Sequence, residues 1–391
     1  MFMKIAILHE MLVKLWGAEK VVKKLLDIFP EADLYTLIYD EKKVGEVFPK
    51  KYGKGKEIRT PWAPQFIYEV LKNQRFCLPF MAKAVESLDF SKYDVLLISS
   101  SAFAHGALTK PETKTIIYYH SPARYLWDWT NEYKKDIGWE RWWKWWILWK
   151  LFMSLREWDF IASQRGSFVL ANSQNVRARI HKYYRKDAQV LYPPVEIDRF
   201  QSDIPKETFE ALEKKYKITS KSYFIILWAL TEFKKVEIAL KGFQELKELP
   251  LVIIGDGPLK KKYEEQTKNN KNILFTGSLY WAELVAMVQN AKALIFPWEE
   301  DFWIVPIEAM GAGIPVFAYK AGGLQESVIE GVTWMFFSHK EGKDFSRLLK
   351  NFNIKIDEKK FESDTIKKHA RQFDEKKFEQ EIRNLIWGEE I

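Results

Sequence analysis

The stretch that decides the fold reads ALIFPWEEDFWIVPIEA and covers residues 293–309. The apolar run 293–296 has the length of a buried strand, and 305–310 has the composition of a helix. Pro306 suits the first turn of that helix, because a backbone N–H at this position would have no partner within the helix. A strand that leads through a short turn into a helix is the unit from which parallel sheets are built.

The same alternation of strand-like and helical segments extends along the chain in two series. The first series of apolar runs lies at 4–8, 93–99, 115–119 and 167–171. The second series follows Pro193-Pro194 and lies at 223–227, 251–254, 273–275, 293–296 and 315–318. This pattern is typical of doubly wound parallel sheets. We therefore expect an α/β protein with one domain at 1–197, a second at 198–372, and a final amphipathic helix within 373–391.

The composition restricts the class of protein. The chain has 391 residues, of which 47% are hydrophobic and 29% charged, and this balance indicates folded domains rather than disorder. Its single cysteine, Cys77, excludes an internal disulfide framework and fits a reducing compartment. The apolar run after Met1 is too short for a signal peptide, and no run approaches a membrane span. We expect a cytoplasmic protein, with a net charge of +8 but no recognisable nucleic-acid module.

Candidate binding residues follow the strands of the second series. The turn after 293–296 would present backbone N–H groups to a diphosphate, and Glu300 and Glu308 could accept hydrogen bonds from sugar hydroxyls. Lys234 and Lys235, which follow 223–227, could neutralise phosphate. The simpler interpretation is that these glutamates favour the start of a helix and that the lysines are solvated.

Two candidates follow strands of the first series. His120 directly follows the apolar run 115–119, and Gly17 lies where the chain enters its first predicted helix. Both positions lie at the carboxyl edge of the expected sheet, where ligands bind in such folds. A lone histidine is more often structural than catalytic, so its place at a strand end favours a function only modestly.

Taken together, in this order and spacing, these segments resemble glycosyltransferase family 4, the retaining enzymes with the GT-B fold, and especially its bacterial mannosyltransferase-like members. The segments that carry the resemblance are 7–20, 120–128, 171–173, 192–195 and the pair Glu300 and Glu308. The resemblance covers almost the whole chain. It implies two Rossmann-like domains that face a central cleft, and a final helix that crosses back to the N-terminal domain.

The resemblance also implies roles for the donor-binding residues. Lys234 and the backbone N–H groups of Ile304 and Val305 would bind the diphosphate of a nucleotide-sugar. Glu308 would hold the ribose, and Glu300 would contact the hydroxyls of the donor sugar. Gly17 would form part of the loop at the donor site.

The implied reaction needs neither a metal nor a separate cofactor. In such enzymes the leaving diphosphate helps to deprotonate the acceptor, and His120 would touch the sugar at the reaction centre. The donor would be a nucleotide-sugar, for which GDP-mannose is our favoured choice, and the acceptor a glycan or a lipid-linked sugar in surface polysaccharide assembly. Two alternatives remain open: another GT-B enzyme such as a nucleotide-sugar 2-epimerase, and a non-catalytic relative that binds sugars or membranes.

The segment Trp139–Phe152 predicts a second partner. It is rich in tryptophan and basic residues, and a helix of this composition suits the interface of a membrane. The alternative is a helix that packs on its own domain. A peripheral enzyme at the inner face of the membrane would meet a lipid-linked acceptor there.

The chain departs from the family at positions that usually hold other residues. Ala229 stands where many members carry an arginine that contacts the diphosphate, a contact that Lys235 could replace. Five tryptophans stand where members usually carry glycine: Trp16, Trp228, Trp298, Trp303 and Trp334. Three of these, Trp16, Trp228 and Trp303, would line the donor site and could block it. The chain has 17 Trp and only 18 Gly, whereas average usage gives roughly 27 Gly.

Repeated replacement of one residue type by another indicates a common cause. In some bacteria the codon UGA encodes glycine, and a reading of UGA as tryptophan would produce this pattern. We predict that the five positions are encoded by UGA, which sequencing of the gene tests directly. UGG at these positions would show that the tryptophans are genuine and would favour the relative with a blocked donor site.

Overall fold

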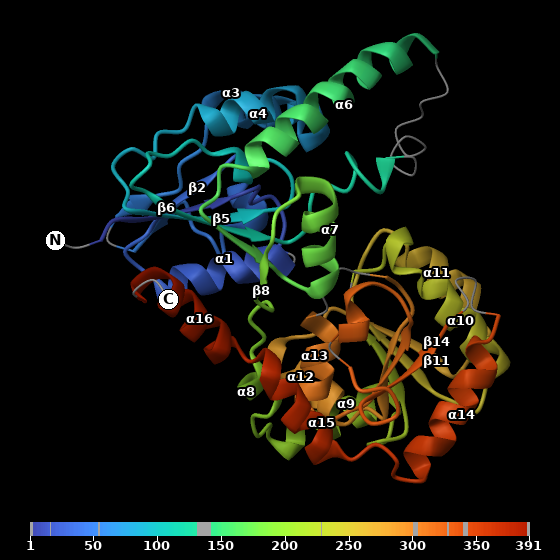
Figure 1. Ribbon diagram of the computed structural model, residues 1–391. Coiled ribbons are helices and arrows are strands. Elements are labelled where there is room, and N and C mark those ends of the chain that lie inside the picture. Colours follow the sequence, from blue (N-terminus) through green and yellow to red (C-terminus); the bar gives the residue numbers. More distant parts are fainter. Residues whose placement is uncertain are drawn as a thin grey trace. The chain divides into compact units, whose positions relative to one another are not determined.

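The computed structural model describes residues 3–388, except 16, 54, 131–141, 228, 300–303, 327 and 339–342. Of residues 142–148, 233, 324 and 325 it describes only the backbone. The chain forms two compact units, each of which is described by itself (Figure 1). The first unit contains the chain up to Pro194 and returns at Phe378, and the second runs from Val195 to Lys377.

The first unit is built on a six-stranded parallel sheet in the order β2-β1-β5-β6-β7-β8. Its strands are β1 (Ile5–His9), β2 (Asp33–Thr36), β5 (Val95–Ser100), β6 (Lys114–Tyr119), β7 (Phe168–Ala171) and β8 (Gln189–Val190). A small antiparallel pair consists of β3 (Lys51–Tyr52) and β4 (Lys56–Glu57). The helices are α1 (Gly17–Ile28), α2 (Glu41–Val44), α3 (Trp62–Leu71), α4 (Leu78–Glu86), α6 (Trp142–Ser163), α7 (Gln174–Tyr184) and α16 (Glu375–Trp387). Short 3₁₀ turns are η1 (Gln74–Cys77) and η2 (Ala104–Gly106).

Both faces of this sheet are buried at its centre, which explains why β1 and β5 are almost continuous apolar runs. Successive residues point to opposite faces, so that Leu96 and Ile98 of β5 join one core and Val95 and Leu97 join the other. The first core includes α4, α6 and α7, and the second includes α1 and α16.

The last helix, α16, packs on the first unit beside α1 (Figure 1). Its buried residues are Phe378, Ile382 and Ile386, the three that follow the helical spacing in the sequence. The Phe378 ring meets Tyr118 of β6 edge-on, with 5.8 Å between the ring centroids. The helix thus contributes apolar side chains to the core of a sheet that was completed almost 200 residues earlier.

The second unit repeats the plan with a six-stranded parallel sheet in the order β11-β10-β9-β12-β13-β14. Its strands are β9 (Phe224–Leu227), β10 (Leu251–Ile254), β11 (Ile273–Gly277), β12 (Ala293–Phe296), β13 (Val316–Tyr319) and β14 (Trp334–Phe337). The helices are α8 (Ile197–Phe200), α9 (Lys206–Tyr216), α10 (Val236–Glu245), α11 (Lys260–Thr267), α12 (Trp281–Gln289), α13 (Ile304–Gly311), α14 (Phe345–Asp357) and α15 (Ser363–Ala370). Short 3₁₀ turns are η3 (Glu232–Lys234), η4 (Gly322–Glu326) and η5 (Arg371–Phe373).

Two predictions about the fold can be compared with this structure. The prediction of two doubly wound α/β domains is confirmed, whereas the cleft between them stays a prediction. The sequence predicts a helix at 139–152, whereas α6 runs from Trp142 to Ser163. Residues 139–141 lie outside the described residues. Helix α6 extends beyond Phe152 because Leu155 and Ala162 continue the buried side of the helix.

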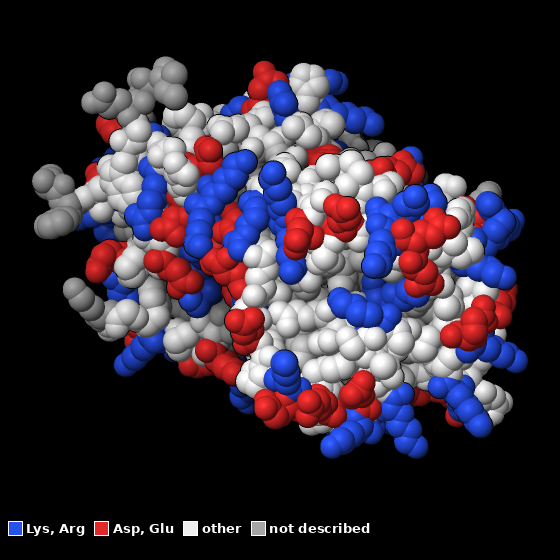
Figure 2. All heavy atoms as spheres, turned by 90° about the horizontal axis from the view of Figure 1, so that it is seen from below, with Lys and Arg blue, Asp and Glu red and all other residues white. Residues whose placement is uncertain are grey.

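The surface charge is mixed on the face shown in Figure 2, where basic side chains alternate with acidic ones. The net charge of +8 is therefore not gathered into one basic patch on this face. Within the described ranges, no helix combines the length and apolar character needed to cross a bilayer.

Candidate active site

The predicted donor residues of the second unit lie where the order of its strands reverses. From β9 the chain continues to β10 on one side, while β12 pairs with β9 on the other side. Lys234 follows β9, and α13 follows β12, so both lie beyond the carboxyl ends of neighbouring strands. Such a reversal opens a crevice at the edge of a parallel sheet, and this is where ligands bind in folds of this kind.

Lys234 lies over a tryptophan in this region. Its Nζ is 4.6 Å from the centroid of the Trp298 ring, a cation–π distance. Trp298 itself is only 1% exposed and is separated from β12 by Pro297 alone. The two side chains therefore connect the ends of β9 and β12, and the indole occupies space beside the ammonium group that is predicted to bind a diphosphate.

The first turn of α13 is positioned to offer backbone donors. Ile304 and Val305 open the helix with buried side chains, and Pro306 is the third residue, as the sequence predicts. The first N–H groups of a helix have no carbonyl partner within it and carry the positive end of the helix dipole. Glu308 lies one turn further into the same helix and is partly exposed.

The remaining donor-site predictions have mixed outcomes. Lys235 has a left-handed backbone with φ of 40°, at the turn between η3 and α10. Its Nζ lies 5.8 Å from the ring of Tyr319, at the end of β13. Four predicted residues lie outside the described residues: Trp16, Trp228, Glu300 and Trp303. Among the described side chains, no three from His, Cys, Asp and Glu gather as metal ligands would.

The carboxyl edge of the first sheet holds His120, directly after β6. Its backbone N–H donates to Ser100 O at 2.9 Å, and its carbonyl accepts from Asn172 Nδ2 at 2.9 Å. The neighbouring strands β5 and β7 thereby fix the position of its backbone. Burial lowers the pKa of the His120 imidazole to about 3, with a further lowering from His9, so that the ring is neutral at pH 7.

His120 also contacts side chains that the sequence analysis did not single out. Its Nε2 is 2.7 Å from Ser99 Oγ, and Ser99 Oγ is 3.0 Å from His9 Nδ1. The available signal was that β1 and β5, both apolar, each end in a polar residue. His9 and Ser99 are 90 positions apart in the sequence and meet because β1 pairs with β5 in this register.

Gly17 begins α1 and is followed two residues later by Glu19, an acidic residue in the first turn of the helix. The neighbouring Lys14 is mostly buried, and this burial lowers its pKa to about 8 despite the opposing effect of Glu19. The segment that leads into α1 and the first turn of this helix thus carry the charged groups Lys14 and Glu19 close to the carboxyl edge of the first sheet, where His120 lies.

The segment after His120 is anchored to two helices. Trp127 Nε1 donates to Asp159 Oδ2 of α6 at 2.8 Å, and the Trp127 ring stacks on Tyr183 of α7 with 5.0 Å between centroids. Arg179 of α7 forms a 2.7 Å ion pair with Asp128. These contacts hold the part of the chain that resembles the family in a fixed place beside the sheet edge.

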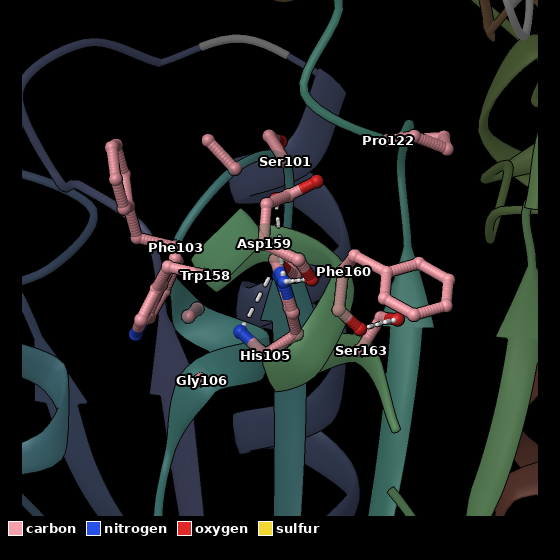
Figure 3. Close-up of polar contacts among 12 residues, drawn as sticks. Ser101, Phe103, His105, Gly106, Pro122, Trp158, Asp159, Phe160 and Ser163 are labelled. Carbon is pink, nitrogen blue, oxygen red and sulfur yellow. Dashed lines mark hydrogen bonds and ion pairs between the residues drawn. The ribbon is translucent and has the colours of Figure 1, made fainter. Parts of the chain in front are cut away.

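Beneath this segment, Asp159 faces His105 in a fully buried pair (Figure 3). His105 Nε2 lies 3.4 Å from Asp159 Oδ1, and His105 Nδ1 is 3.1 Å from Ser100 Oγ. Burial raises the pKa of Asp159 to about 7 and lowers that of His105 to about 4, which favours the neutral form of each. Because neither side chain reaches the surface, we interpret the pair as support for the anchored segment rather than as a contact for substrate.

The two described tryptophans at predicted glycine positions are closely crowded. The ring centroids of Trp298 and Phe296 are 3.8 Å apart, whereas aromatic pairs prefer 4.5–7 Å. Trp334 is fully buried, and its Nε1 lies 2.9 Å from Met310 Sδ. That distance is usual for an oxygen acceptor and short for the larger sulfur atom. Both indoles are therefore tightly packed, and a smaller residue at either position would relieve these short contacts.

Two family descriptions match the chain. The family described as "Glycosyltransferase Family 4" matches residues 17–199, and the one described as "Glycosyl transferases group 1" matches residues 208–371. Each match covers most of one of the two doubly wound units; the first includes Gly17 and His120, and the second includes Lys234 and Glu308.

Similar proteins of known activity match part of the chain. The human alpha-1,3/1,6-mannosyltransferase ALG2 is 24% identical over 205 residues, which are 47% of this chain and 49% of ALG2. The GDP-mannose-dependent alpha-(1-6)-phosphatidylinositol monomannoside mannosyltransferase of Mycolicibacterium smegmatis is 25% identical over 178 residues, 41% of this chain and 46% of the relative. The chain thus matches about half the length of each.

A solved structure extends the likeness to the whole fold. Anabaena Alr3699/HepE, crystallised in complex with UDP, superposes with a TM-score of 0.72 over 98% of this chain and 99% of its own. Its sequence is 16% identical. The fold is that of the GT-B glycosyltransferases, with two Rossmann-like domains.

The crowding of Trp298 leads to a testable prediction. We expect Trp298→Gly to cost much less than the roughly 3–5 kcal/mol of unfolding free energy that truncation of a well-packed Trp costs. Removing the indole also frees Lys234, so the affinity for GDP should rise about tenfold or more. Urea denaturation and isothermal titration calorimetry measure the two effects.

Trp158→Gly is the matched control. Trp158 is partly buried in α6 and its Nε1 donates to Glu86 Oε1 at 2.9 Å, so its loss should carry the full cost and leave GDP affinity unchanged. If Trp298→Gly proves as destabilising as Trp158→Gly, the indole belongs to the native packing and the glycine hypothesis is wrong.

Proposed function

Because this chain belongs to glycosyltransferase family 4, we propose that it transfers a sugar, with retention of configuration, from a nucleotide-sugar to a glycan or lipid-linked acceptor. The observation that carries the proposal is the position of Lys234 and of the first turn of α13. They flank the point where the strand order reverses in the second unit. A cation and the first N–H groups of a helix at such a crevice suit a diphosphate.

In this proposal the second unit stabilises the leaving group. Lys234 and the N–H groups of Ile304 and Val305 offset the charge that develops on the diphosphate as the bond to the sugar breaks. Glu308 binds the ribose, and Glu300 binds hydroxyls of the sugar. Since these groups supply positive charge and orientation from the protein itself, the proposed reaction uses no metal.

In the first unit, the proposed contact with the sugar is His120. Its neutral ring can exchange a hydrogen bond with a hydroxyl but cannot act as a cation at pH 7. The role is therefore one of positioning, because a reaction in which the diphosphate itself takes the acceptor proton depends mainly on the alignment of the two substrates.

Mannose is the proposed sugar and GDP-mannose the proposed donor. The support comes from the names of two relatives, both mannosyltransferases and one of them GDP-mannose-dependent. The structurally similar HepE binds UDP instead, so the nucleotide base needs a direct test.

A donor screen by thermal shift tests the proposal. GDP and GDP-mannose should raise the melting temperature of the full chain more than UDP and UDP-glucose do, because a ligand stabilises the state that binds it. Lys234→Met should weaken GDP binding about 10- to 100-fold, the usual value of a hydrogen bond to a charged group. The control is Lys268→Met, at an exposed position beyond α11, which should leave the affinity unchanged.

The outcomes of the screen separate the proposed donor from another nucleotide-sugar and from a closed donor site. Preferential binding of UDP would contradict the choice of GDP-mannose while supporting a nucleotide-sugar donor. Failure of every nucleoside diphosphate to bind, with UGG at the five tryptophan positions, would favour the alternative in which Trp298 and its counterparts close the donor site. That alternative has one observation in its favour, the indole beside Lys234.

We propose, further, that the first unit meets its acceptor at a membrane surface. Exposed apolar side chains gather on α3, η1 and α4, and we call them the aromatic face: Trp62, Phe66, Val70, Leu71, Phe76 and Phe80. Trp62 is 77% exposed and stacks on Phe66. The exposed basic residues Lys72, Arg75 and Lys83 lie among them. Exposed aromatic groups interspersed with basic ones are typical of surfaces that bind anionic lipid.

The exposed apolar side chains of α6, next to the aromatic face, support the same proposal. The helix contacts α4 and lies beside it in Figure 1. Trp149, Met153 and Ile161 are exposed on this helix although Phe152 and Leu155 are buried, so it carries apolar side chains on both sides. Of the segment Trp139–Phe152, only the last residues have described side chains.

We expect the full chain to bind vesicles of phosphatidylcholine and phosphatidylglycerol and to bind pure phosphatidylcholine more weakly. Changing Trp62, Phe66 and Phe76 together to Ser should reduce vesicle binding in a sedimentation assay about tenfold or more, because most of the inserted apolar area is lost. Tyr280→Ser is the control, since Tyr280 is a highly exposed aromatic residue of the second unit. Equal binding by the triple variant and the control would contradict this assignment.

A further inference from the structure

A chain of polar contacts crosses the carboxyl edge of the first sheet. It starts at Glu19 in the first turn of α1, whose Oε1 lies 3.8 Å from His9 Nε2. His9 Nδ1 is 3.0 Å from Ser99 Oγ, and Ser99 Oγ is 2.7 Å from His120 Nε2. His9, Glu19 and Ser99 are all at most 5% exposed. Three buried polar side chains are thus aligned behind a single, partly exposed histidine.

The sheet itself sets the geometry of this chain. His9 and Ser99 are paired in the register of β1 with β5, where the strand order of the first sheet reverses. The His120 backbone is bonded to β5 on one side and to Asn172 on the other. No flexible loop is needed to bring the rings and the hydroxyl together, so the contacts are pre-organised.

The number of available hydrogens determines the direction of the hydrogen bonds that join Ser99 to His9 and His120. The Ser99 hydroxyl has one hydrogen, so when it donates to one ring nitrogen it must accept from the other. The contact between Glu19 and His9 is too long for a hydrogen bond, yet a carboxylate at 3.8 Å favours an N–H on the nitrogen that faces it. In a neutral His9 ring the hydrogen then lies on Nε2, and Nδ1 accepts from Ser99.

The same logic continues to His120. Since the Ser99 hydrogen is directed to His9, its oxygen accepts from His120, which must carry its hydrogen on Nε2. The ring is neutral, because burial lowers the pKa of His120 well below its ordinary value. A neutral imidazole with hydrogen on Nε2 has a lone pair on Nδ1.

We propose that Glu19, His9 and Ser99 are positioning residues that fix the tautomer of His120, so that His120 Nδ1 accepts a hydrogen bond from a hydroxyl of the bound sugar. The part that concerns the sugar rests on the proposed transferase function, whereas the tautomer does not. The contacts from Glu19 through His9 and Ser99 to His120 form a relay. This relay favours a ligand group that donates a hydrogen bond, such as a sugar hydroxyl, over one that can only accept. The three buried residues Glu19, His9 and Ser99 thereby determine that His120 accepts, rather than donates, the hydrogen bond to the ligand.

Nitrogen-15 spectra of the full chain with labelled histidine test the tautomer directly, because Nδ1–H and Nε2–H imidazoles have different patterns of shifts and couplings. The His120 signals are assigned by their loss in His120→Asn. We expect the wild-type ring to be neutral with hydrogen on Nε2. Ser99→Ala should give a mixture of tautomers, and Ser99→Thr, which keeps the hydroxyl, should restore the wild-type pattern.

The neighbouring serine provides a matched control. Ser100 is equally buried, but its Oγ contacts His105 instead of His120, so Ser100→Ala should leave the His120 signals unchanged. Glu19→Gln removes the charge beside His9 and should increase the share of the Nδ1–H form. A wild-type His120 with hydrogen on Nδ1, or an unchanged pattern in Ser99→Ala, would overturn the proposal.

Kinetics then test the consequence for the sugar. With GDP-mannose as donor, Ser99→Ala should lower kcat about tenfold with little change in the KM for donor, while Ser99→Thr and Ser100→Ala stay near wild type. An equal rate in Ser99→Ala would refute the contact with the sugar. If the expected tautomer is found but no transfer is detected with any nucleotide-sugar, the relay stands and the proposed function fails.

Discussion

Everything proposed for the donor site depends on the parallel pairing of β9 with β12. Because the strands are parallel, their carboxyl ends lie at one edge, and the segments that follow them begin side by side. The chain leaves β9 toward β10 on one side and returns to the other side of β9 at β12, so the connections that follow these two strands lead in opposite directions. Lys234 and the start of α13 can therefore approach one ligand although they are some 70 residues apart.

The first unit uses the same constraint for another purpose. The order of its strands reverses between β1 and β5, and there the ends of the strands carry His9 and Ser99 rather than phosphate-binding groups. Helix α16 follows the second unit in the sequence but packs on the first. It covers the face of the first sheet opposite α6 and α7. The two units thus repeat one architecture and differ in the chemistry placed at the reversal.

The sequence predicts the fold well where a strand is buried on both faces. The runs at 251–254 and 293–296 match β10 and β12 exactly in length because all four residues of each are apolar. Elements of mixed composition escape prediction: β2 begins with Asp33 and ends with Thr36, and α9 buries a single side chain, Leu212. In such elements local pattern is weak and packing against distant parts of the chain decides the structure.

The candidate site is predicted less completely, for a physical reason. His120 directly follows the apolar strand β6, and Lys234 lies in the turn between β9 and α10, so both can be found from their positions after strands. The contact of Lys234 with Trp298, and of His120 with Ser99, arises from pairing between strands far apart in the sequence, which no local pattern encodes. The resemblance to the family suggested which residues matter, whereas the contacts of Lys234 and His120 are seen only in the structure.

The most direct test of the central claim is a crystal structure of the chain with bound nucleoside diphosphate. We expect the phosphates to lie at the reversal between β9 and β12, within hydrogen-bond distance of Lys234 Nζ and of the N–H groups of Ile304 and Val305. A diphosphate bound elsewhere, or held without contact to Lys234 and α13, would contradict the central claim.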